Sequence, residues 1–397
     1  MSVSQRARNI VPSATLTIAA TARRMRAQGI DVIGFGSGEP DFDTPDHIKA
    51  AAIQAIHEGF TKYTASGGID ELKDAVVTKL KRDNGLEFAR DQILISCGGK
   101  HSIFNVFQAL LEPGDEVIIP APYWVSFPEQ VKVCDAKPVF VRTREHEGFR
   151  LHRGLVESHL TPRTKILVLN SPCNPTGAAL TPAELKGLAD LATERGFWIL
   201  SDETYEALVY DGYQHVSVAS LGDEVKSRTI VVNSLSKAYA MTGWRVGYTA
   251  GPKDVIKAMD AIQSQETSNP TSIAQRAAVV ALTGPQETTY RMREEFDRRR
   301  RYIVDRLNGM PGISCLSPQG AFYVFPNVSG TFGKHTVGTT IRNSTEFTAY
   351  LLDAARIAVV PGVEFGSDDH VRISYATSMA NIEKGMDRMA GAIAQLG

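Results

Sequence analysis

The chain has 397 residues, with 43 Lys and Arg against 44 Asp and Glu, so its formal net charge at pH 7 is −1. Apolar residues make up 43% and charged residues 22%, which is typical of a globular protein and excludes intrinsic disorder. The balanced charge excludes a whole-chain attraction to nucleic acid or an anionic membrane, and no run approaches the ~18 apolar residues of a membrane-spanning helix.

The N-terminal stretch and the cysteines indicate a cellular compartment. The apolar stretch from Leu16 to Ala22 is short and interrupted by threonines, so it does not fit a signal peptide. The four cysteines are widely spaced without a C-x-x-C pair, so we expect free thiols and a cytoplasmic protein.

Strand and helix patterns alternate through the middle of the chain. Apolar residues between Ile103 and Leu111 recur every three or four positions, which predicts a helix over 102–111. A capping box with proline at the first helical position, Thr181 to Glu184, predicts a helix through Glu194. Continuous apolar runs predict strands buried on both faces at Val117–Pro120, Pro138–Val141, Ile166–Leu169, Phe197–Leu200 and Thr229–Val232. This alternation predicts an α/β fold with a mostly parallel sheet.

After Pro285 the pattern changes to that of a smaller α+β domain. A long charged helix over Arg291–Leu307 contains the run Arg298–Arg301, and nearby acidic residues favour a solvated, ion-paired face over a nucleic-acid patch. A helix near Ser344–Ala355, a strand over Val371–Tyr375 and a closing helix are expected next. We predict an N-terminal segment over 1–47 that packs with this smaller domain, a large domain over 48–284 and the small domain over 285–397.

Familiar catalytic motifs fail in their details. The glycine-rich stretch from Gly34 has Glu39 where a dinucleotide fingerprint needs its third glycine. Gly98-Gly-Lys100 lacks the upstream glycine and the following Ser or Thr of a phosphate-binding loop. Ser234-Leu-Ser-Lys237 matches the S-x-x-K of penicillin-binding enzymes, but their S-D-N and K-T-G partners are absent.

Polar residues instead follow three predicted strands at the point where each should end. They are Asn174, then Asp202 with Tyr205, then Lys237, and Arg245 stands shortly afterwards. Ligands bind beyond the carboxyl ends of parallel strands, so these side chains should converge on one cleft. A lysine for a Schiff base, an acid for a pyridinium nitrogen and donors for a phosphate are what pyridoxal phosphate requires.

With these residues the chain resembles the class I aminotransferases of fold-type I over nearly its whole length. It is most similar to the bacterial aspartate aminotransferases of the subgroup that includes aspartate/prephenate enzymes. The matching stretches occur in the family's order: Gly38–Pro45, Lys62–Thr64, Gly98–Lys100, Pro122–Ser126, Ser171–Gly177, Ser201–Tyr205, Ser236–Tyr248, Pro318–Tyr323 and Val371–Ser378. The resemblance implies a large and a small domain, pyridoxal 5'-phosphate as cofactor, no metal, and ping-pong exchange of an amino group between aspartate or glutamate and 2-oxoglutarate or oxaloacetate.

The resemblance also implies how the cofactor ring is held. Lys237 would carry the cofactor and later move the substrate proton, and Asp202 would keep the ring nitrogen protonated. Asn174 and Tyr205 would hydrogen-bond the phenolate oxygen of the ring, and Trp124 would stack on its face.

For the cofactor phosphate, the family uses the N-terminus of a helix. The amides of Gly99 and Lys100 would bind it, together with Arg245 and the hydroxyls of Ser234 and Ser236. Tyr63 would reach the phosphate in the neighbouring subunit, which makes a homodimer with shared sites the functional unit.

The substrate would be held at both of its ends. Arg372 would bind the α-carboxylate in a bidentate pair, helped by the backbone at Gly38, with Asn174 and Trp124 alongside. In the branch that prefers dicarboxylic substrates, Lys100, Ser13 and Thr15 would meet the distal carboxylate.

Other functions stay open at this point. A prephenate or aromatic aminotransferase uses the same scaffold, as does a β-lyase or decarboxylase. Strong prephenate users usually have Lys or Arg before the Pro-Ser-Ala-Thr motif, where this chain has Val11, so we expect aspartate exchange. A transcriptional regulator with an aminotransferase domain needs a DNA-binding domain of about a hundred residues ahead of the fold, and 33 residues precede Gly34. We expect no nucleic-acid or membrane partner.

Overall fold

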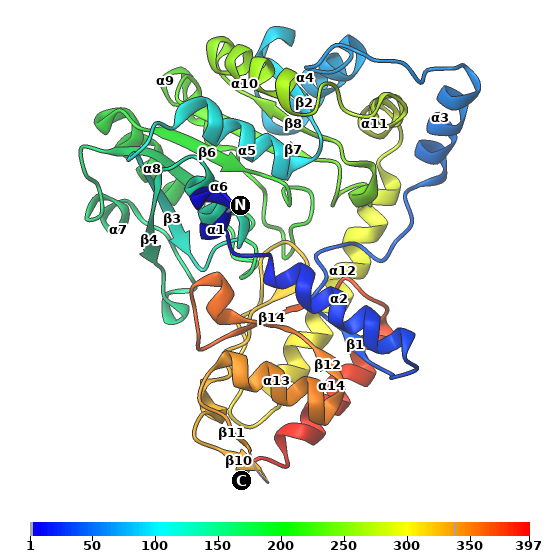
Figure 1. Cartoon of the computed structure of the whole chain (residues 1–397), viewed down its shortest axis with the longest axis vertical. Coiled ribbons are helices and arrows are strands. Elements are labelled where there is room, and N and C mark those ends of the chain that lie inside the picture. Colours follow the sequence, from blue (N-terminus) through cyan, green and yellow to red (C-terminus); the bar gives the residue numbers. More distant parts are fainter. Residues whose placement is uncertain (1–2, 337–338) are drawn as a thin grey trace.

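The computed structural model describes residues 3–336 and 339–397 (Figure 1). Within these residues one seven-stranded sheet has the order β2-β8-β7-β6-β5-β3-β4. Five neighbouring strands are parallel, and they confirm the five predicted ones: β3 (Glu116–Ala121), β4 (Lys137–Arg142), β5 (Thr164–Asn170), β6 (Trp198–Asp202) and β7 (Thr229–Ser234). Two strands of the sheet were not predicted: β2 (Ile93–Ser96) and β8 (Gly247–Ala250), which is antiparallel to both of its neighbours.

Helices cover both faces of this sheet, as the continuous apolar strands predict (Figure 1). Along β5, Ile166 and Val168 pack in one hydrophobic cluster while Leu167 and Leu169 pack in another. The first cluster includes residues of α5 (Gly99–Leu110), α6 (Ser126–Val133) and α10 (Lys253–Glu266), and the second those of α8 (Pro182–Arg195). The predicted helix over 102–111 therefore begins three residues earlier, at Gly99.

The capping box that predicts α8 is present. Thr181 Oγ1 accepts from the Glu184 amide at 3.3 Å, and Glu184 Oε2 accepts from the Thr181 amide at 2.7 Å. Gly196, with φ 78°, ends the helix in the left-handed conformation that glycine adopts without strain. Local sequence therefore fixes both ends of this element.

A second group of elements lies below the large sheet in Figure 1. A three-stranded sheet, β13-β14-β9, packs with helices around one large cluster that also contains Ile33 and Phe35. The elements are α12 (Glu287–Asn308), β9 (Tyr323–Val324), β12 (Ile357–Ala358), β13 (Val360–Pro361), α13 (Ser344–Ala355), β14 (Val371–Ser374) and α14 (Met379–Ile393). Outside the N-terminal segment, the other α-helices and strands of the described residues are α3 (Asp46–His57), α4 (Asp70–Asn84), α7 (Arg153–Glu157), α9 (Asp223–Lys226), α11 (Ser272–Thr283), β10 (His335–Thr336) and β11 (Thr339–Thr340).

The N-terminal segment contacts both groups of elements. β1 (Ile33–Gly34) pairs in parallel with β12, and α2 (Ala14–Ala27) lies against β12 and β13. The short helix α1 (Gln5–Asn9) contacts α6 of the large sheet instead, where Arg6 pairs with Asp135 at 2.6 Å. The boundaries at 47/48 and 284/285 stay a prediction. No helix in residues 3–336 and 339–397 is long and apolar enough to cross a membrane.

The arginine run on α12 is ion-paired, but it is not wholly solvated. Arg298 and Arg301 are exposed and pair with Glu295 and Asp297. The expectation is wrong for the two central arginines, which are buried: Arg299 pairs with Asp41 and Arg300 with Asp211, each at 2.7 Å. The helical period turns the middle of the run inward, where it holds α12 to its neighbours.

A close backbone approach sets the start of α5 against β8. A Cβ on Gly247 would stand 2.5 Å from the Gly99 amide nitrogen and 2.6 Å from the Gly98 carbonyl carbon. Backbone atoms cannot turn aside as a flexible side chain can, so this position excludes any side chain. The helix N-terminus is thereby held at the end of the large sheet.

We expect Gly247→Ala to lower the free energy of unfolding by about 1–3 kcal/mol, because the added methyl group forces the two backbones apart. Gly391→Ala is the matched control: a Cβ there meets nothing within 4 Å inside α14, so it should stabilise by roughly 0.5–1 kcal/mol. Urea unfolding of both variants measures these changes. Equal effects of the two substitutions would contradict the close approach.

Candidate active site

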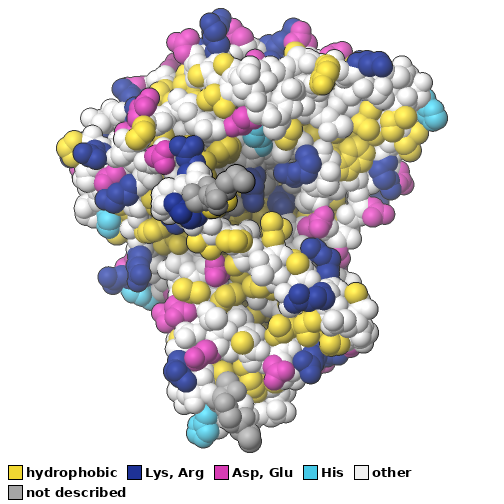
Figure 2. All heavy atoms as spheres, viewed as in Figure 1, with side chains coloured by type: hydrophobic (Ala, Val, Ile, Leu, Met, Phe, Trp, Pro, Cys, Tyr) yellow, Lys and Arg dark blue, Asp and Glu magenta, His cyan; other side chains and the backbone are white. Residues whose placement is uncertain are grey.

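A cleft of about 460 Å³ opens at the carboxyl ends of the parallel strands. The face drawn in Figure 2 is hollowed near its centre, and Lys and Arg side chains gather there. The cleft is lined by fourteen of the predicted site residues: Ser13, Thr15, Gly38, Gly99, Lys100, Trp124, Asn174, Asp202, Tyr205, Ser234, Ser236, Lys237, Arg245 and Arg372. Tyr63 is the exception, because its side chain is 89% exposed and lies outside the cleft.

Strand register brings these residues together. Asn170 at the end of β5 is opposite Asp202 at the end of β6, and Ser234 ends β7 opposite Gly247 of β8. The next residues of the chain leave the sheet at one edge, where no further strand covers them. The side chains therefore converge as the parallel order requires.

Lys237 lies half-buried in the cleft. Its Nζ donates to the Gly38 carbonyl, and its ammonium lies 5.7 Å from the centre of the Phe322 ring. Burial lowers the pKa of Lys237 to about 8, and the charges of Arg372 and Arg245 act in the same direction. A lysine with this pKa has a reactive neutral fraction near physiological pH, as a nucleophile toward an aldehyde needs.

Among the described residues, Asp202 is one of two carboxylates that line the cleft, the other being Glu39. Burial raises the pKa of Asp202 to about 6, while a hydrogen bond from the Thr204 amide, 3.2 Å from Oδ1, acts in the opposite direction. Above pH 6 the group is an anion in a poorly solvated site. Such an anion favours a protonated partner such as a pyridinium nitrogen.

Arg372 is a buried cation, 1% exposed, that no acidic side chain neutralises among the described residues. It donates through Nη1 to Asn174 Oδ1 and through Nη2 to the Gly36 carbonyl, both at 2.8 Å. Its Nε finds no partner in the part of the chain that is described, and the Tyr323 ring lies 4.5 Å away. Burial lowers the pKa of Arg372. An unneutralised buried guanidinium is suited to bind a carboxylate.

The two tyrosines beside Arg372 and Asp202 share a hydrogen bond. Tyr205 and Tyr323 hydroxyls lie 2.7 Å apart, and burial raises the pKa of Tyr205 well above its ordinary value. Both hydroxyls therefore stay protonated; one of them donates to the other, which leaves the second O–H free to donate to an anionic oxygen in the cleft. Asn174 accepts from Arg372 through its oxygen, which leaves its amide group to donate in the same way.

At the other end of the cleft, α5 begins with Gly99, so the first-turn amides of the helix face the cavity. Arg245 lies beside them, held by the Thr242 carbonyl at 2.8 Å and the Cys97 carbonyl at 3.3 Å. Ser234 and Ser236 add two hydroxyls. Helix amides, a guanidinium and hydroxyls together form an anion site that fits a phosphate.

A third group of polar residues lies at the mouth of the cleft. The Lys100 ammonium is 5.1 Å from the centre of the Trp124 ring, and burial lowers the pKa of Lys100, helped by the charge of Arg245. Across residues 3–336 and 339–397, Lys100 has no ion pair and the buried Thr15 hydroxyl has no hydrogen-bond partner. Ser13 lies next to them as the N-cap of α2.

The cleft also contains residues that sequence reasoning missed, among them Glu39, Asn170, Thr242 and Tyr323. Glu39 accepts from the Thr242 hydroxyl, and its charge raises the pKa of Lys237 against the effect of burial. Glu39 was not predicted as a site residue because it was considered only as the position at which a dinucleotide motif fails, although it lies in the stretch Gly38–Pro45 that matches the family. Tyr323 also lies in such a stretch.

Pyridoxal phosphate fits this arrangement. Asp202 offers an anion for the ring nitrogen, the helix amides with Arg245 offer a phosphate site, and Lys237 lies in the same cavity with a lowered pKa. Arg372 Nε and Thr15 Oγ1, which have no hydrogen-bond partner in the described part of the chain, belong to residues that line the remainder of the cleft, where a substrate has room.

Comparisons with known proteins find similarity along nearly the whole chain. Residues 30–389 match the model of the family described as aminotransferase class I and II. The chain is 48% identical to an aspartate aminotransferase of Geobacillus stearothermophilus, over 98% of each chain. It is 47% identical to an aspartate/prephenate aminotransferase of Nitrosomonas europaea, over 98% of this chain and 99% of that one. The crystal structure of the Rhizobium meliloti aspartate aminotransferase superposes with a TM-score of 0.97 at 47% identity, covering 100% of both chains.

Because the pKa of Lys237 is lowered, we expect the free energy of unfolding to change differently with pH in the cofactor-free wild type and in the cofactor-free variant Lys237→Met. Between pH 8 and pH 10.5 the unfolded chain keeps a proton on Lys237 that the folded chain has lost, so wild-type stability gains with rising pH. Across this window the free energy of unfolding of the wild type should therefore rise by roughly 3 kcal/mol relative to that of the variant. Urea unfolding at a series of pH values measures it, and parallel profiles would show that Lys237 is not desolvated.

Proposed function

The chain belongs to the class I and II aminotransferases, and we propose that it is an aspartate aminotransferase that uses pyridoxal 5'-phosphate. It moves the amino group between L-aspartate or L-glutamate and 2-oxoglutarate or oxaloacetate. The observation that carries the substrate class is a pair of cations in one cleft, Arg372 and Lys100, neither with an acidic partner among the described residues. Two unneutralised cations suit a substrate with two carboxylates.

The residues of the cleft divide the chemistry between them. Bound pyridoxal phosphate supplies an electron sink for the electron pair that remains when a proton leaves the substrate α-carbon. Lys237 anchors the cofactor, and its amine, with a pKa of about 8, then removes and returns that proton. Asp202 holds a proton on the ring nitrogen. Asn174 and Tyr205 hold the ring oxygen, and Trp124 covers the ring.

The substrate is oriented from its two ends. Arg372 binds the α-carboxylate through the N–H groups that Asn174 and Gly36 leave free. Lys100, with the hydroxyls of Thr15 and Ser13, binds the distal carboxylate. α2 carries Ser13 and Thr15 on the N-terminal segment, so the bound substrate joins that segment to α5.

A second candidate function is prephenate transamination, which the name of the Nitrosomonas europaea relative favours. The surroundings of Val11 disfavour it. The Val11 amide donates to Glu129 Oε2 at 2.9 Å, and a neighbouring cavity of about 390 Å³ is lined by Glu129 and Glu364. Lys100 also lines this cavity and Lys132 pairs with Glu129 at 2.7 Å, so these surroundings disfavour prephenate only because Val11 itself supplies no cation where one is needed.

The functional unit that we propose is a homodimer in the cytoplasm. Tyr63 is 89% exposed, and Ile53 and Ile56 on the nearby helix α3 are also exposed, at 55% and 51%. Exposed apolar and aromatic side chains of this kind favour a protein interface. In the proposed dimer Tyr63 reaches the cofactor phosphate in the partner's site, and the small-molecule substrates are the other binding partners.

We expect Lys100→Ala to lower kcat/KM for aspartate by roughly tenfold to a few thousandfold, because the distal carboxylate loses its counter-charge in a water-poor site. Alanine and phenylalanine have no distal carboxylate, so their kcat/KM should be spared. Profiling amino donors with both enzymes tests the proposed function itself. Equal losses for all donors would remove Lys100 from substrate binding, and equal wild-type kcat/KM for prephenate and oxaloacetate would favour the second function.

The shared site predicts complementation between two impaired variants. Tyr63→Ala and Lys237→Ala each disable a site, but a mixed dimer holds one site with both lesions and one with neither. After subunit exchange, activity should recover towards about a quarter of wild type at random pairing. Mass spectrometry confirms the exchange, and exchange without recovery would place Tyr63 in the site of its own subunit.

A further inference from the structure

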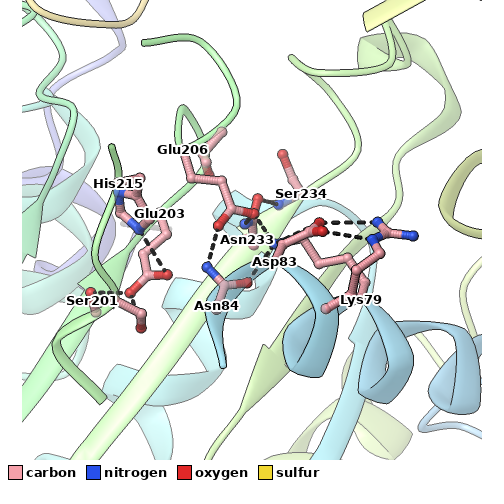
Figure 3. A network of polar contacts seen from close by, with 12 residues as sticks. Lys79, Asp83, Asn84, Ser201, Glu203, Glu206, His215, Asn233 and Ser234 are labelled. Carbon is pink, nitrogen blue, oxygen red and sulfur yellow. Dashed lines mark hydrogen bonds and ion pairs between the residues drawn. The ribbon is translucent and has the colours of Figure 1, made fainter. Parts of the chain in front are cut away.

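A network of buried charged groups lies beside Asp202, and the proposed chemistry does not use it (Figure 3). The segment that follows β6 contains two acidic residues, Glu203 and Glu206, on either side of Thr204 and Tyr205. The Glu203 side chain is 2% exposed and that of Glu206 is 12% exposed. Two carboxylates removed from water need partners for each oxygen.

Each carboxylate oxygen of Glu206 has a partner, and the partners come from two distant parts of the chain, α4 and β7. Its Oε1 contacts the buried Lys79 ammonium of α4 and accepts from Asn233 Nδ2 at 2.6 Å. Its Oε2 accepts from Asn84 Nδ2 at 2.7 Å, while Asn84 Oδ1 accepts from Lys79 at the same distance. Burial acts to raise the pKa of Glu206, but the charges of Lys79 and His215, together with the hydrogen bonds from Asn84 and Lys79, leave this pKa below its ordinary value.

These contacts join the two halves of the cofactor site. Asn233 connects Glu206 to the segment that leads to Lys237, because Asn233 Oδ1 accepts from the Ser234 amide of that segment at 2.7 Å. In the other direction, the Glu206 amide donates to the Glu203 carbonyl at 2.9 Å, one turn after Asp202. One side chain therefore links the segment that bears Asp202 and Tyr205 to the segment that bears Ser234, Ser236 and Lys237.

Glu203 anchors the same segment on its other side. Its Oε1 accepts from Ser201 at 2.8 Å and from Ser217 at 2.7 Å, and its Oε2 faces His215 Nε2 at 3.2 Å. Glu203, Glu206 and His215 bring three possible metal ligands within 4.8 Å. Glu206, however, already has an ammonium and two amides as partners, so the group is better explained as a structural charge network than as a metal site.

We propose that Glu206 is a positioning residue of the cofactor site: through Lys79, Asn84 and Asn233 it holds the ring-binding and phosphate-binding segments at a fixed separation. The inference rests on the proposed use of pyridoxal phosphate. A rigid cofactor that is held at its ring nitrogen, its phosphate and its aldehyde carbon binds best when these three supports are already in place. Glu206 itself does not line the cleft.

Glutamine at position 206 cannot serve the same partners. It offers one acceptor oxygen, whereas Lys79 and Asn233 donate to one carboxylate oxygen and Asn84 to the other. Its amide group would face another donor, and the Lys79 ammonium would stay buried without a counter-charge. Glu206→Gln should therefore raise the dissociation constant of pyridoxal phosphate roughly tenfold to a hundredfold, as the loss of a supporting contact does in other sites.

The experiment compares three variants with the wild type. Glu116→Gln is the matched control: Glu116 is buried, pairs with Lys137 at 2.9 Å and accepts from Thr161 at 2.7 Å, but it begins β3 at the opposite edge of the same sheet. The double variant Lys79→Met with Glu206→Gln removes the unpaired ammonium. For each protein the cofactor is removed and pyridoxal phosphate is titrated back by absorbance, and the thermal midpoint of the cofactor-free form is measured.

We expect both Gln variants to lower the thermal midpoint and Glu206→Gln alone to weaken cofactor binding. The double variant should regain thermal stability without regaining affinity, which separates positioning from folding. An unchanged dissociation constant in Glu206→Gln overturns the inference. Full recovery of affinity in the double variant overturns it as well. If Glu206→Gln fails to fold, the affinity of the double variant is the measurement that decides. A wild-type protein that binds no pyridoxal phosphate would contradict the proposed function instead.

Discussion

The excess of cations over carboxylates in one cleft is the constraint on which this structure depends: among the described residues, Lys100, Lys237, Arg245 and Arg372 line it together with Glu39 and Asp202. Lys237 is partly and Arg372 almost wholly removed from water in this cleft, and burial lowers the pKa of both groups. Such an arrangement costs free energy in the empty protein, and that cost is offset when anionic groups enter. The large sheet, the helix α5 and the small three-stranded sheet each supply part of the cleft, so its two halves must stay aligned for the cations to be useful.

Alignment comes from strand register and from polar contacts beneath the cleft. The register of β5, β6 and β7 places three chain exits at one sheet edge. The absence of a side chain at Gly247 lets β8 approach the start of α5, and the contacts of Glu206 tie two of the exits together. Each device acts on the backbone that carries a functional group rather than on the group itself. Precise chemistry in the cleft therefore depends on residues that do not line it.

Much of the fold and of the cleft could be predicted locally. Continuous apolar runs predict the five parallel strands, and the Thr181–Glu184 capping box predicts the start of α8. The strand-end positions of Asn174, Asp202 and Lys237 predict their convergence because parallel topology leaves them few alternatives. The strand β8 escaped prediction because Gly247 and Thr249 interrupt its apolar run, whereas β2 was missed although Ile93–Ile95 is an apolar run like those of the predicted strands. The buried arginines of α12 escaped prediction because charge alone suggests exposure.

The sequence by itself determined which groups are available and roughly where each element lies, since capping, periodicity and turn chemistry act over a few residues. Only the tertiary structure decided which charges are neutralised. Nothing in the sequence around them distinguishes the charge state of Lys79 from that of Lys100, yet Lys79 is paired with Glu206, whereas Lys100 has no ion pair in the described residues. Arg372 likewise becomes a buried cation because folding removes water from it and brings Asn174 and Tyr323 against it, and on this ground we propose it as the carboxylate site. Desolvation depends on contacts between distant segments, which no local pattern contains.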